Sequence, residues 1–347
     1  MRKNILQLAA ILLCAVSCNH AALEHDAFSD MATMSLTLYD PQPELSKSAL
    51  VSDGNSYRNA TLLVYDEVTA DGNGGNLVYE FKDLSPGATV SGIELHKKEK
   101  YNFYAVCNYE PGAFTAPGTV AQLEAMTLPV SFFDHKMMRT GRVTDVEAID
   151  GRSVMLQVMP VAARLMLRMD KSAVAGEVAS FTVRSVIAKQ SPQYFSPFGY
   201  SYSAEQVKDG DFLSAEDLQN LNSGVPGIAL YIPENMQGTV GAITASKDKF
   251  PANLPSPMKD RASYVEILAD VILKSGDAGT ITYRFYPGAN AVDDFNIERG
   301  MQYNVIFAPS AKIYNTDTWK LSSPFINAYI DPDDSGGGSS DDIIIEH

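Results

Sequence analysis

Apolar and polar residues alternate along most of the chain, which is the pattern of strands that bury one face. In residues 34–39, for example, Met34, Leu36 and Leu38 share one face, while the serine and threonine between them point the other way. The same signal predicts further strands at residues 61–65, 77–81, 101–107, 154–158, 161–169, 178–187, 228–232, 239–243, 264–273, 280–286, 302–307 and 325–330. The body of the chain is therefore expected to consist mainly of strands.

Helical patterns are few. Thr119 with Gln122, and Ser214 with Asp217, have the spacing of a capping box before short apolar runs. Clusters of Gly, Pro, Asn and Asp separate the strands, whereas a parallel α/β sheet would need long helical crossovers. We therefore predict an all-β, mainly antiparallel fold of β-sandwiches with a few short helices, divided near Pro160.

The amino terminus has the form of a secretory signal. Two basic residues precede an apolar run at residues 5–16, which is too short to span a bilayer. The run ends on Ala-Val-Ser-Cys, which resembles a bacterial lipobox, so Cys18 would become a lipidated amino terminus; ordinary cleavage near this site is the alternative. Acyl chains such as palmitate on Cys18 would anchor the protein to a membrane. The predicted regions are a signal peptide (1–17), a lipidated tether (18–33), an N-terminal sandwich (34–159), a C-terminal sandwich (160–330) and a flexible acidic tail (331–347).

Composition narrows the functional classes. The chain has 347 residues, of which 45% are apolar, so it can bury a sizeable core. Its 27 basic and 42 acidic residues give a net charge of −15, which argues against a nucleic-acid partner because phosphate binding needs clustered Lys and Arg. The three cysteines, Cys14, Cys18 and Cys107, cannot build a disulfide framework.

Catalytic groups are scarce in the sequence. His96 begins a basic turn, His135 lies in a predicted loop, and Cys107 lies on an apolar strand, where a core residue is expected rather than a nucleophile. The common sequence motifs for nucleophiles, phosphate loops, zinc and redox pairs are missing. We therefore expect no enzymatic activity and no cofactor.

Two patterns near the carboxyl end have more than one interpretation. A calcium-loop spacing is matched in part by Asp331, Asp333, Ser335, Gly336, Ser339 and Asp342. Its last ligand is Asp instead of the usual Glu, and no helices flank it. A Gly-Ser-Asp linker produces the same match, so we expect a linker without metal and keep calcium as the alternative. Trp319 with Tyr314 could line a sugar-binding surface, although packing at a sandwich edge is the commoner role.

Four stretches form a series along the chain: residues 101–108 (YNFYAVCN) with the helix and strand that follow, 229–238 (ALYIPENMQG), 263–267 (SYVEI), and 286–305 with YPG, DFNIERG and YNV. Their order and spacing resemble the fimbrillins, the lipoprotein pilins of type V pili in anaerobic gut and oral bacteria. The resemblance extends over most of the mature chain.

This resemblance implies two transthyretin-like β-sandwich domains, export as a lipoprotein to the outer membrane and cell surface, trimming by a surface protease, and polymerisation with other pilin subunits by donor-strand exchange. A strand is then lost from one subunit, and a neighbour's strand fills the groove. Residues 34–39 would be that strand, and we expect them to pair at a sheet edge over an apolar groove. Cleavage after a basic residue beyond the strand matches Lys47, with Arg58 the nearest arginine; loop cations without a special role are the alternative for both.

The carboxyl end offers a candidate donor strand. A flexible acidic tether delivers a short run of isoleucines, and the predicted strand before the tether would contribute because three isoleucines fill few pockets. The residues of the two segments are Phe325, Ile326, Tyr329 and Ile330, followed by Ile343, Ile344 and Ile345. A tail that pairs with its own domain, or frays, is the alternative.

The leading hypothesis is a shaft or accessory subunit of a fimbrium, whose partners are other pilin subunits, a processing protease and the outer membrane. One alternative is a monomeric surface lipoprotein that binds a glycan or a host protein through its loops. Another is a pilus anchor or tip adhesin. An anchor would keep its first strand, and a tip subunit would lack a usable donor tail.

Overall fold

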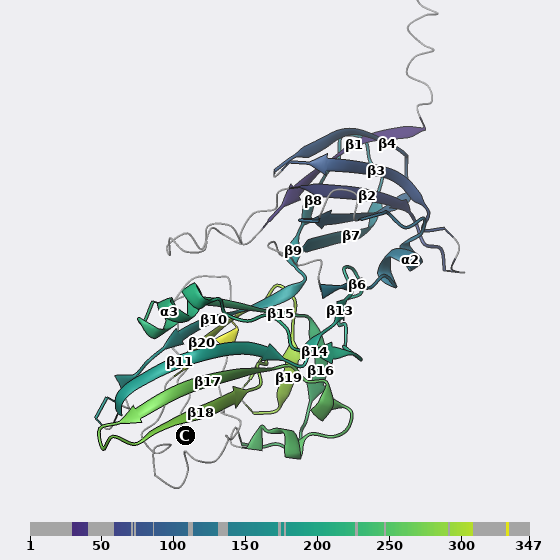
Figure 1. The fold of residues 1–347 in the computed structure, drawn as a ribbon. Coiled ribbons are helices and arrows are strands. Elements are labelled where there is room, and N and C mark those ends of the chain that lie inside the picture. Colours follow the sequence, from purple (N-terminus) through teal and green to yellow (C-terminus); the bar gives the residue numbers. More distant parts are fainter. Residues whose placement is uncertain are drawn as a thin grey trace, which may run out of the picture.

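The computed structural model shows two β-sandwiches, one above the other in the view of Figure 1. It describes residues 30–40, 59–307 and 331–332, without residues 71, 73, 86, 110–113, 131–137, 173–174, 177, 226–227, 246–247 and 291. Strand pairing is mostly antiparallel and the helices are few and short, so the predicted fold class is confirmed. In these described ranges, no helix combines the length and apolarity needed to cross a bilayer.

The first sandwich is formed by residues 30–160. Its strands are β1 (Met31–Tyr39), β2 (Ala60–Asp66), β3 (Leu77–Leu84), β4 (Thr89–His96), β5 (Lys100–Cys107), β7 (Arg139–Glu147), β8 (Ser153–Gln157) and β9 (Met159–Pro160). One sheet has the order β4-β1-β8 and the other the order β3-β2-β5-β7-β9. The short α2 (Val120–Glu124) and β6 (Leu128–Pro129) lie between β5 and β7 along the chain.

The second sandwich follows directly. Its main strands are β10 (Ala162–Met169), β11 (Val178–Lys189), β15 (Ile228–Pro233), β17 (Tyr264–Leu273), β18 (Ala278–Phe285), β20 (Gln302–Phe307) and β21 (Asp331–Pro332). They form the sheets β15-β10-β20-β21 and β11-β17-β18. The shorter elements are β12 (Ser191–Pro192), β13 (Tyr194–Phe195), β14 (Val207–Lys208), α3 (Ala215–Asn222), β16 (Asn235–Thr239), β19 (Asp294–Ile297) and the 3-10 turns Pro251–Asn253 and Met258–Asp260.

The two sandwiches repeat one arrangement that the sequence does not reveal. In the first, β1 pairs antiparallel with β4 and parallel with β8. In the second, β10 pairs antiparallel with β15 and parallel with β20. The first long strand of each sandwich is therefore central in its sheet. It has an antiparallel neighbour on one side and, on the other, a parallel neighbour from later in the chain.

The apolar pattern of a strand depends on whether one or both of its faces are buried by other parts of the protein. In β1, alternate side chains are buried, because only one face of its sheet meets the core. In β2, nearly every side chain is buried. Leu62 and Val64 join the core between the two sheets, whereas Leu63 and Tyr65 pack on the opposite face with α2 and the second sandwich. Central strands covered on both faces therefore have continuous apolar runs.

Most of the predicted elements are present in the structure. Both short helices form: the Thr119 side chain accepts from the Gln122 amide, and Ser214 with Asp217 makes a full capping box. The strand predicted at 239–243 is wrong, because β16 ends at Thr239 and the chain then turns, with the Ile243 amide donating to the Val240 carbonyl at 2.8 Å. The strand predicted at 325–330 lies outside the described residues.

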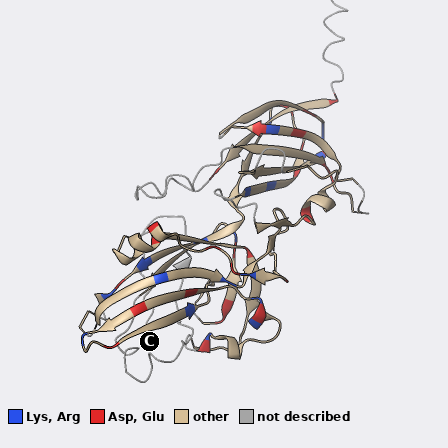
Figure 2. Cartoon of the chain, viewed as in Figure 1, with Lys and Arg blue, Asp and Glu red and all other residues tan. Residues whose placement is uncertain are grey.

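Of the longer strands, β4 and β7 were not predicted, for identifiable reasons, and neither were several short ones such as β19. β4 contains a glycine with φ of +75° at Gly92, beside a register shift that interrupts its alternation. β7 begins with Arg139 and Thr140, which are polar residues that the fold buries. Charged residues of both signs are spread over the two sandwiches (Figure 2).

Candidate assembly site and the junction between the sandwiches

The strand that sequence analysis expects to be lost lies in the middle of its sheet. β1 pairs with β4 from Met31 to Thr37 and with β8 from Ser35 to Tyr39. The prediction of an edge strand is therefore wrong, since both edges of β1 are hydrogen-bonded. Position within a sheet depends on pairing with residues more than fifty positions away, which alternation alone does not encode. Removing β1 would leave a slot between β4 and β8, with unpaired backbone groups on both sides.

The buried face of β1 contributes directly to the core. Ala32, Met34, Leu36 and Leu38 are at most 3% exposed and pack in the cluster that fills the first sandwich. The predicted inward face of residues 34–39 is therefore confirmed. A fully buried Met or Leu side chain contributes about 1.5–3 kcal/mol, so an empty slot would expose a strongly apolar surface.

An ion pair fixes the end of β1. Asp40 follows the strand, and its Oδ1 accepts a hydrogen bond at 2.9 Å from Nη1 of Arg139, the first residue of β7 in the opposite sheet. The Arg139 side chain is 1% exposed and that of Asp40 is 13% exposed. Burial lowers the pKa of the Arg139 guanidinium, and the Asp40 carboxylate opposes this effect. The pair therefore connects the two sheets of the sandwich at the point where β1 ends.

The predicted processing, lipidation and donor residues lie outside the described residues. These are Cys18, Lys47, Arg58, Phe325, Ile326, Tyr329, Ile330, Ile343, Ile344 and Ile345. Of the calcium-loop match, only the backbone of Asp331 and Pro332 is described, and it pairs with β20 of the second sandwich. In the part of the chain that the structure describes, no three His, Cys, Asp or Glu residues are grouped so that they could hold a metal ion.

The residues considered for catalysis have ordinary surroundings. Cys107 is completely buried at the end of β5, and burial raises the pKa of its thiol far above the usual range. It is therefore a core residue, as predicted. His96 is exposed at the end of β4, next to the turn that leads into β5. His135 lies outside the described residues.

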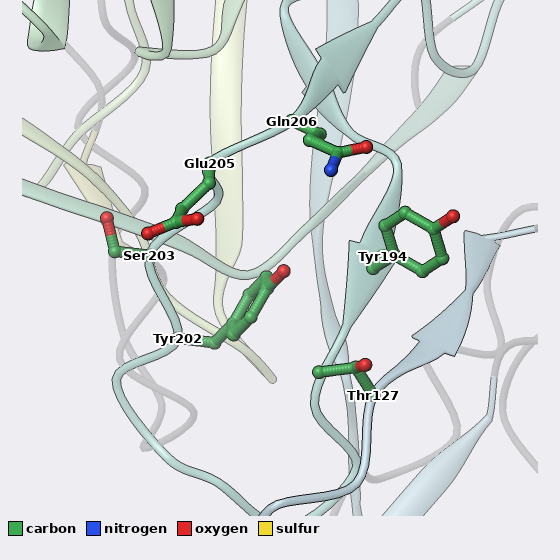
Figure 3. A pocket seen from close by; sticks show the side chains of 6 residues that line it. All are labelled: Thr127, Tyr194, Tyr202, Ser203, Glu205 and Gln206. Carbon is green, nitrogen blue, oxygen red and sulfur yellow. The ribbon is translucent and has the colours of Figure 1, made fainter.

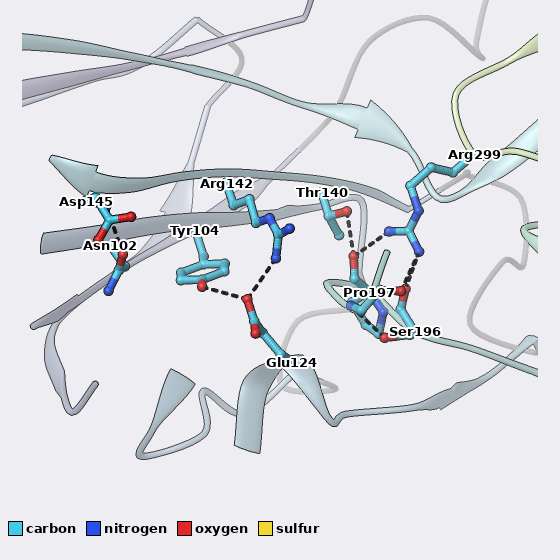
Figure 4. Close-up of polar contacts among 10 residues, drawn as sticks. Asn102, Tyr104, Glu124, Thr140, Arg142, Asp145, Ser196, Pro197 and Arg299 are labelled. Atoms are coloured by element: carbon cyan, nitrogen blue, oxygen red, sulfur yellow. Dashed lines mark hydrogen bonds and ion pairs between the residues drawn. The ribbon is translucent and has the colours of Figure 1, made fainter. Parts of the chain in front are cut away.

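The two sandwiches are joined by a loop of the second one, residues 196–206, which we call the junction loop. The Pro197 carbonyl accepts hydrogen bonds from Thr140 Oγ1 of the first sandwich and from Arg299 Nη1 of the second, each at 2.8 Å. Arg299 Nη2 also donates to the Ser196 carbonyl at 2.9 Å (Figure 4). The junction loop is therefore held from both sides.

A second set of contacts surrounds the Tyr200 ring. The guanidinium carbons of Arg142 and Arg299 lie 4.4 and 4.6 Å from the ring centroid, within the range of a cation–π interaction. Glu124 Oε1, at the end of α2, accepts hydrogen bonds from Tyr104 and Arg142 at 3.0 and 2.8 Å (Figure 4). The loop, β7 and α2 thus form one polar network.

Apolar packing supports the same junction. Tyr104 and Val106 of β5 share a buried cluster with Val161, Phe195 and Phe198 of the second sandwich. The rings of Tyr104 and Phe198 meet edge to face, with centroids 5.2 Å apart. Because this interface is both apolar and hydrogen-bonded, the sandwiches have a defined contact rather than a free hinge.

Residues from the stretches 229–238 and 286–305 hold the junction loop in place. Glu234 Oε2 accepts from Arg299 Nη2 at 2.5 Å, with both side chains at most 3% exposed. Asn235 accepts from the Ala204 amide at 3.1 Å, and Gln237 Nε2 donates to Ser203 Oγ at 3.0 Å. In the sequence, Glu234 and Arg299 belong to two separate motifs of the fimbrillin resemblance, and nothing there shows that they pair.

Two β-sandwiches, each with its first long strand central in a sheet, are also the architecture of solved fimbrial and cell adhesion proteins. The tip fimbrial protein Mfa3 of Porphyromonas gingivalis, with C-terminal truncation, is 10% identical, with a TM-score of 0.53, over 80% of this chain and 94% of that one. A putative cell adhesion protein of Bacteroides eggerthii is 13% identical, with a TM-score of 0.51, over 90% and 94% of the two chains. One of Parabacteroides distasonis is 13% identical, with a TM-score of 0.52, over 80% and 88%.

The chain therefore has the fold of fimbrial and cell adhesion proteins, as the fimbrillin resemblance implied. A domain of unknown function, DUF4906, matches residues 230–307. That segment contains Glu234, Asn235, Gln237 and Arg299, which hold the junction loop. No protein with curated annotation matches this sequence.

Proposed function

We propose that this chain is a structural subunit of a cell-surface fimbrium, in a shaft or accessory position. It is exported as a lipoprotein through Cys18, trimmed by a protease beyond β1, and polymerised when a strand of another subunit takes the place of β1. The fold shared with fimbrial and cell adhesion proteins supports a role at the cell surface and argues for a non-enzymatic one.

One observation carries the proposal: β1 is a central strand whose loss leaves a slot of strand width. It is buried on one face, paired on both edges, and followed by residues 41–58, which contain Lys47. A single cut in this segment separates β1 from the rest of the sandwich. An emptied slot between β4 and β8 has apolar pockets and unpaired N–H and C=O groups, and an added strand satisfies both.

The pairing also defines how an incoming strand lies in the slot. In the direction of β1, it pairs antiparallel with β4 and parallel with β8. Its inward side chains then replace those of Met34, Leu36 and Leu38. A donor therefore needs alternate apolar residues, and the segments ending at Ile330 and Ile345 are the candidates within this chain.

Proteolysis tests the trimming step. The full chain is treated with a trypsin-type protease, the new amino terminus is sequenced, and unboiled samples are run in SDS. We expect a cut after Lys47 or Arg58 and ladders that resist SDS. Lys47→Ala and Arg58→Ala, alone and together, identify the site, and Lys97→Ala, an exposed turn cation, is the matched control. A trimmed chain that stays monomeric contradicts the proposal and favours a monomeric surface binder.

Deletion of residues 331–347 tests the donor separately. If the tail is the donor, the trimmed chain loses its ladder. An unchanged ladder rejects that role for the tail but leaves strand exchange in place, with the segment ending at Ile330 as the remaining candidate.

A further inference from the structure

A polar pocket opens at the junction between the sandwiches, apart from the slot of β1. Its volume is about 430 Å³, within the range of small-ligand sites. Figure 3 shows two tyrosine rings, an amide and a carboxylate around this hollow. Its lining residues are Thr127, from the segment between α2 and β6, Tyr194 of β13, and Tyr202, Ser203, Glu205 and Gln206 of the junction loop.

The wall formed by the junction loop is preorganised. The Tyr202 amide donates to Glu234 Oε2 at 3.1 Å, and the Tyr202 carbonyl accepts from the Met236 amide at 2.9 Å. The next residues are held by Asn235 and Gln237, as described above. Glu234 and Asn235 are 2% and 0% exposed. A loop fixed by buried polar side chains loses little conformational freedom when a ligand binds.

The side chains that face the pocket keep polar atoms available. Among the described residues, the side chains of Tyr194, Tyr202, Glu205 and Gln206 have no hydrogen-bond partner in the protein. Tyr194 is 40% exposed. Burial, and then the nearby Glu205 carboxylate, raise the pKa of Tyr202, so its hydroxyl stays protonated and can donate.

This set of groups restricts the ligand. Among the lining residues that the structure describes, only Glu205 is charged, and its negative charge disfavours anions such as sulfate, phosphate or a sialic acid. None of these described residues is aliphatic, so they offer no apolar surface for a peptide anchor. What remains is flat aromatic surface beside hydroxyl, amide and carboxylate groups, and this combination matches a pyranose ring with apolar C–H faces and a rim of hydroxyls.

We propose that this pocket binds a neutral oligosaccharide, with a sugar ring against Tyr194 or Tyr202 and hydroxyls bonded to Glu205 and Gln206. The site gives the protein an adhesive function in addition to assembly. Because it lies at the junction and not in the β1 slot, binding does not depend on trimming or polymerisation.

A glycan array followed by calorimetry tests the proposal on the full chain. The array contains neutral, sulfated and sialylated oligosaccharides, and calorimetry uses the neutral compound with the strongest signal. We expect saturable binding of neutral compounds. Tyr194→Ala, Tyr202→Ala and Glu205→Gln should each weaken it at least tenfold, and Tyr202→Phe should keep part of the affinity because the ring remains. Phe212→Ala, which removes an exposed aromatic ring outside the pocket, should change nothing.

The variants also need a stability control, since Tyr202 lies in a loop held at the junction. The thermal unfolding of each variant is compared with that of the unaltered chain. If Tyr202→Ala does not fold, the test rests on Glu205→Gln, which changes an exposed side chain. The proposal is overturned if no neutral oligosaccharide binds, if only sulfated or sialylated compounds bind, or if folded pocket variants bind as well as the unaltered chain.

Discussion

Arg139 Nη1 donates to Asp40 Oδ1 at 2.9 Å, so the residue that directly follows β1 is bound to a buried cation of the opposite sheet. Removing one partner of a buried ion pair leaves the other in a low dielectric and costs about 3–5 kcal/mol. Asp40→Ala should therefore destabilise the untrimmed chain and lower its Tm by roughly 6–15 °C. Thermal unfolding by circular dichroism measures this change.

Two further variants test the cause of that loss. Asp30→Ala removes an exposed carboxylate at the other end of β1 and should leave the Tm within a degree or two. Asp40→Ala combined with Arg139→Met should be more stable than Asp40→Ala alone, because the buried cation is removed together with its carboxylate. Equal losses for Asp40→Ala and Asp30→Ala would show that the ion pair contributes nothing.

A disulfide across β1 and β4 should prevent assembly. Thr37 and Thr89 are paired residues of the two strands, and their hydroxyl oxygens are 2.9 Å apart on the exposed face. Cysteines at such facing positions are close enough to form a disulfide. In Thr37→Cys with Thr89→Cys, we expect the oxidised trimmed chain to stay monomeric in unboiled SDS gels and to form ladders after reduction.

The matched control places the disulfide in the second sandwich. Glu266 and Arg284 are paired residues of β17 and β18, so cysteines there should leave the ladder unchanged with and without reductant. A ladder from the oxidised β1–β4 variant would exclude loss of β1 as the assembly step.

Local patterns predicted the faces of the strands well, but not their neighbours. The alternation around Leu36 identifies its inward face, because burial and period are encoded in a few adjacent residues. The place of β1 between β4 and β8 depends on partners such as Thr89 and Ser153, which only the folded chain brings together. In the same way, Glu234 and Arg299 were found as parts of two motifs, and their pairing across 65 positions was not.

The buried pair at the junction should be essential for the second sandwich. Glu234→Gln removes the carboxylate that faces Arg299 at 2.5 Å and also weakens the acceptor of the Tyr202 amide. We expect a loss of about 3–5 kcal/mol, as for other broken buried pairs, measured by urea unfolding. Glu298→Gln, one residue from Arg299 but exposed, should have little effect, and a similar loss in both variants would contradict this role for Glu234.

A buried lysine should make stability depend on pH. Lys249 is 2% exposed, and its Nζ donates to the Asn290 carbonyl at 2.9 Å. Burial lowers its pKa to about 8, although Asp294 and Asp293 oppose this. An unfolded lysine titrates near 10.4, so between about pH 8 and pH 10 the unfolded chain binds more protons than the folded one. The free energy of unfolding should therefore rise with pH in this window.

Urea unfolding at intervals across that window measures the slope. Lys249→Met should remove the rise that Lys249 causes and should be more stable than the unaltered chain at neutral pH, where most of the buried amine is charged. Lys259→Met, which replaces an exposed lysine, should keep the original slope. If Lys249→Met keeps it as well, another group controls the pH dependence.

The last prediction concerns what an incoming strand must carry. A cut after Lys47 or Arg58 removes Asp40 together with β1, so the buried Arg139 loses that carboxylate. A donor that supplies an acid at this place restores the pair and should bind more tightly. In this chain, Asp331 directly follows Ile330, and Glu346 directly follows Ile345, so both candidate donor segments have an acid after their apolar run.

Synthetic peptides of residues 30–40, with Asp40 or with Asp40→Asn, test this without knowledge of the natural donor. On the trimmed chain, we expect the Asp40 peptide to bind at least tenfold more tightly by calorimetry, and neither peptide should bind the untrimmed chain. Equal affinities would show that apolar pockets and backbone pairing alone select the strand, and failure of both to bind would mean that the slot closes once β1 has left.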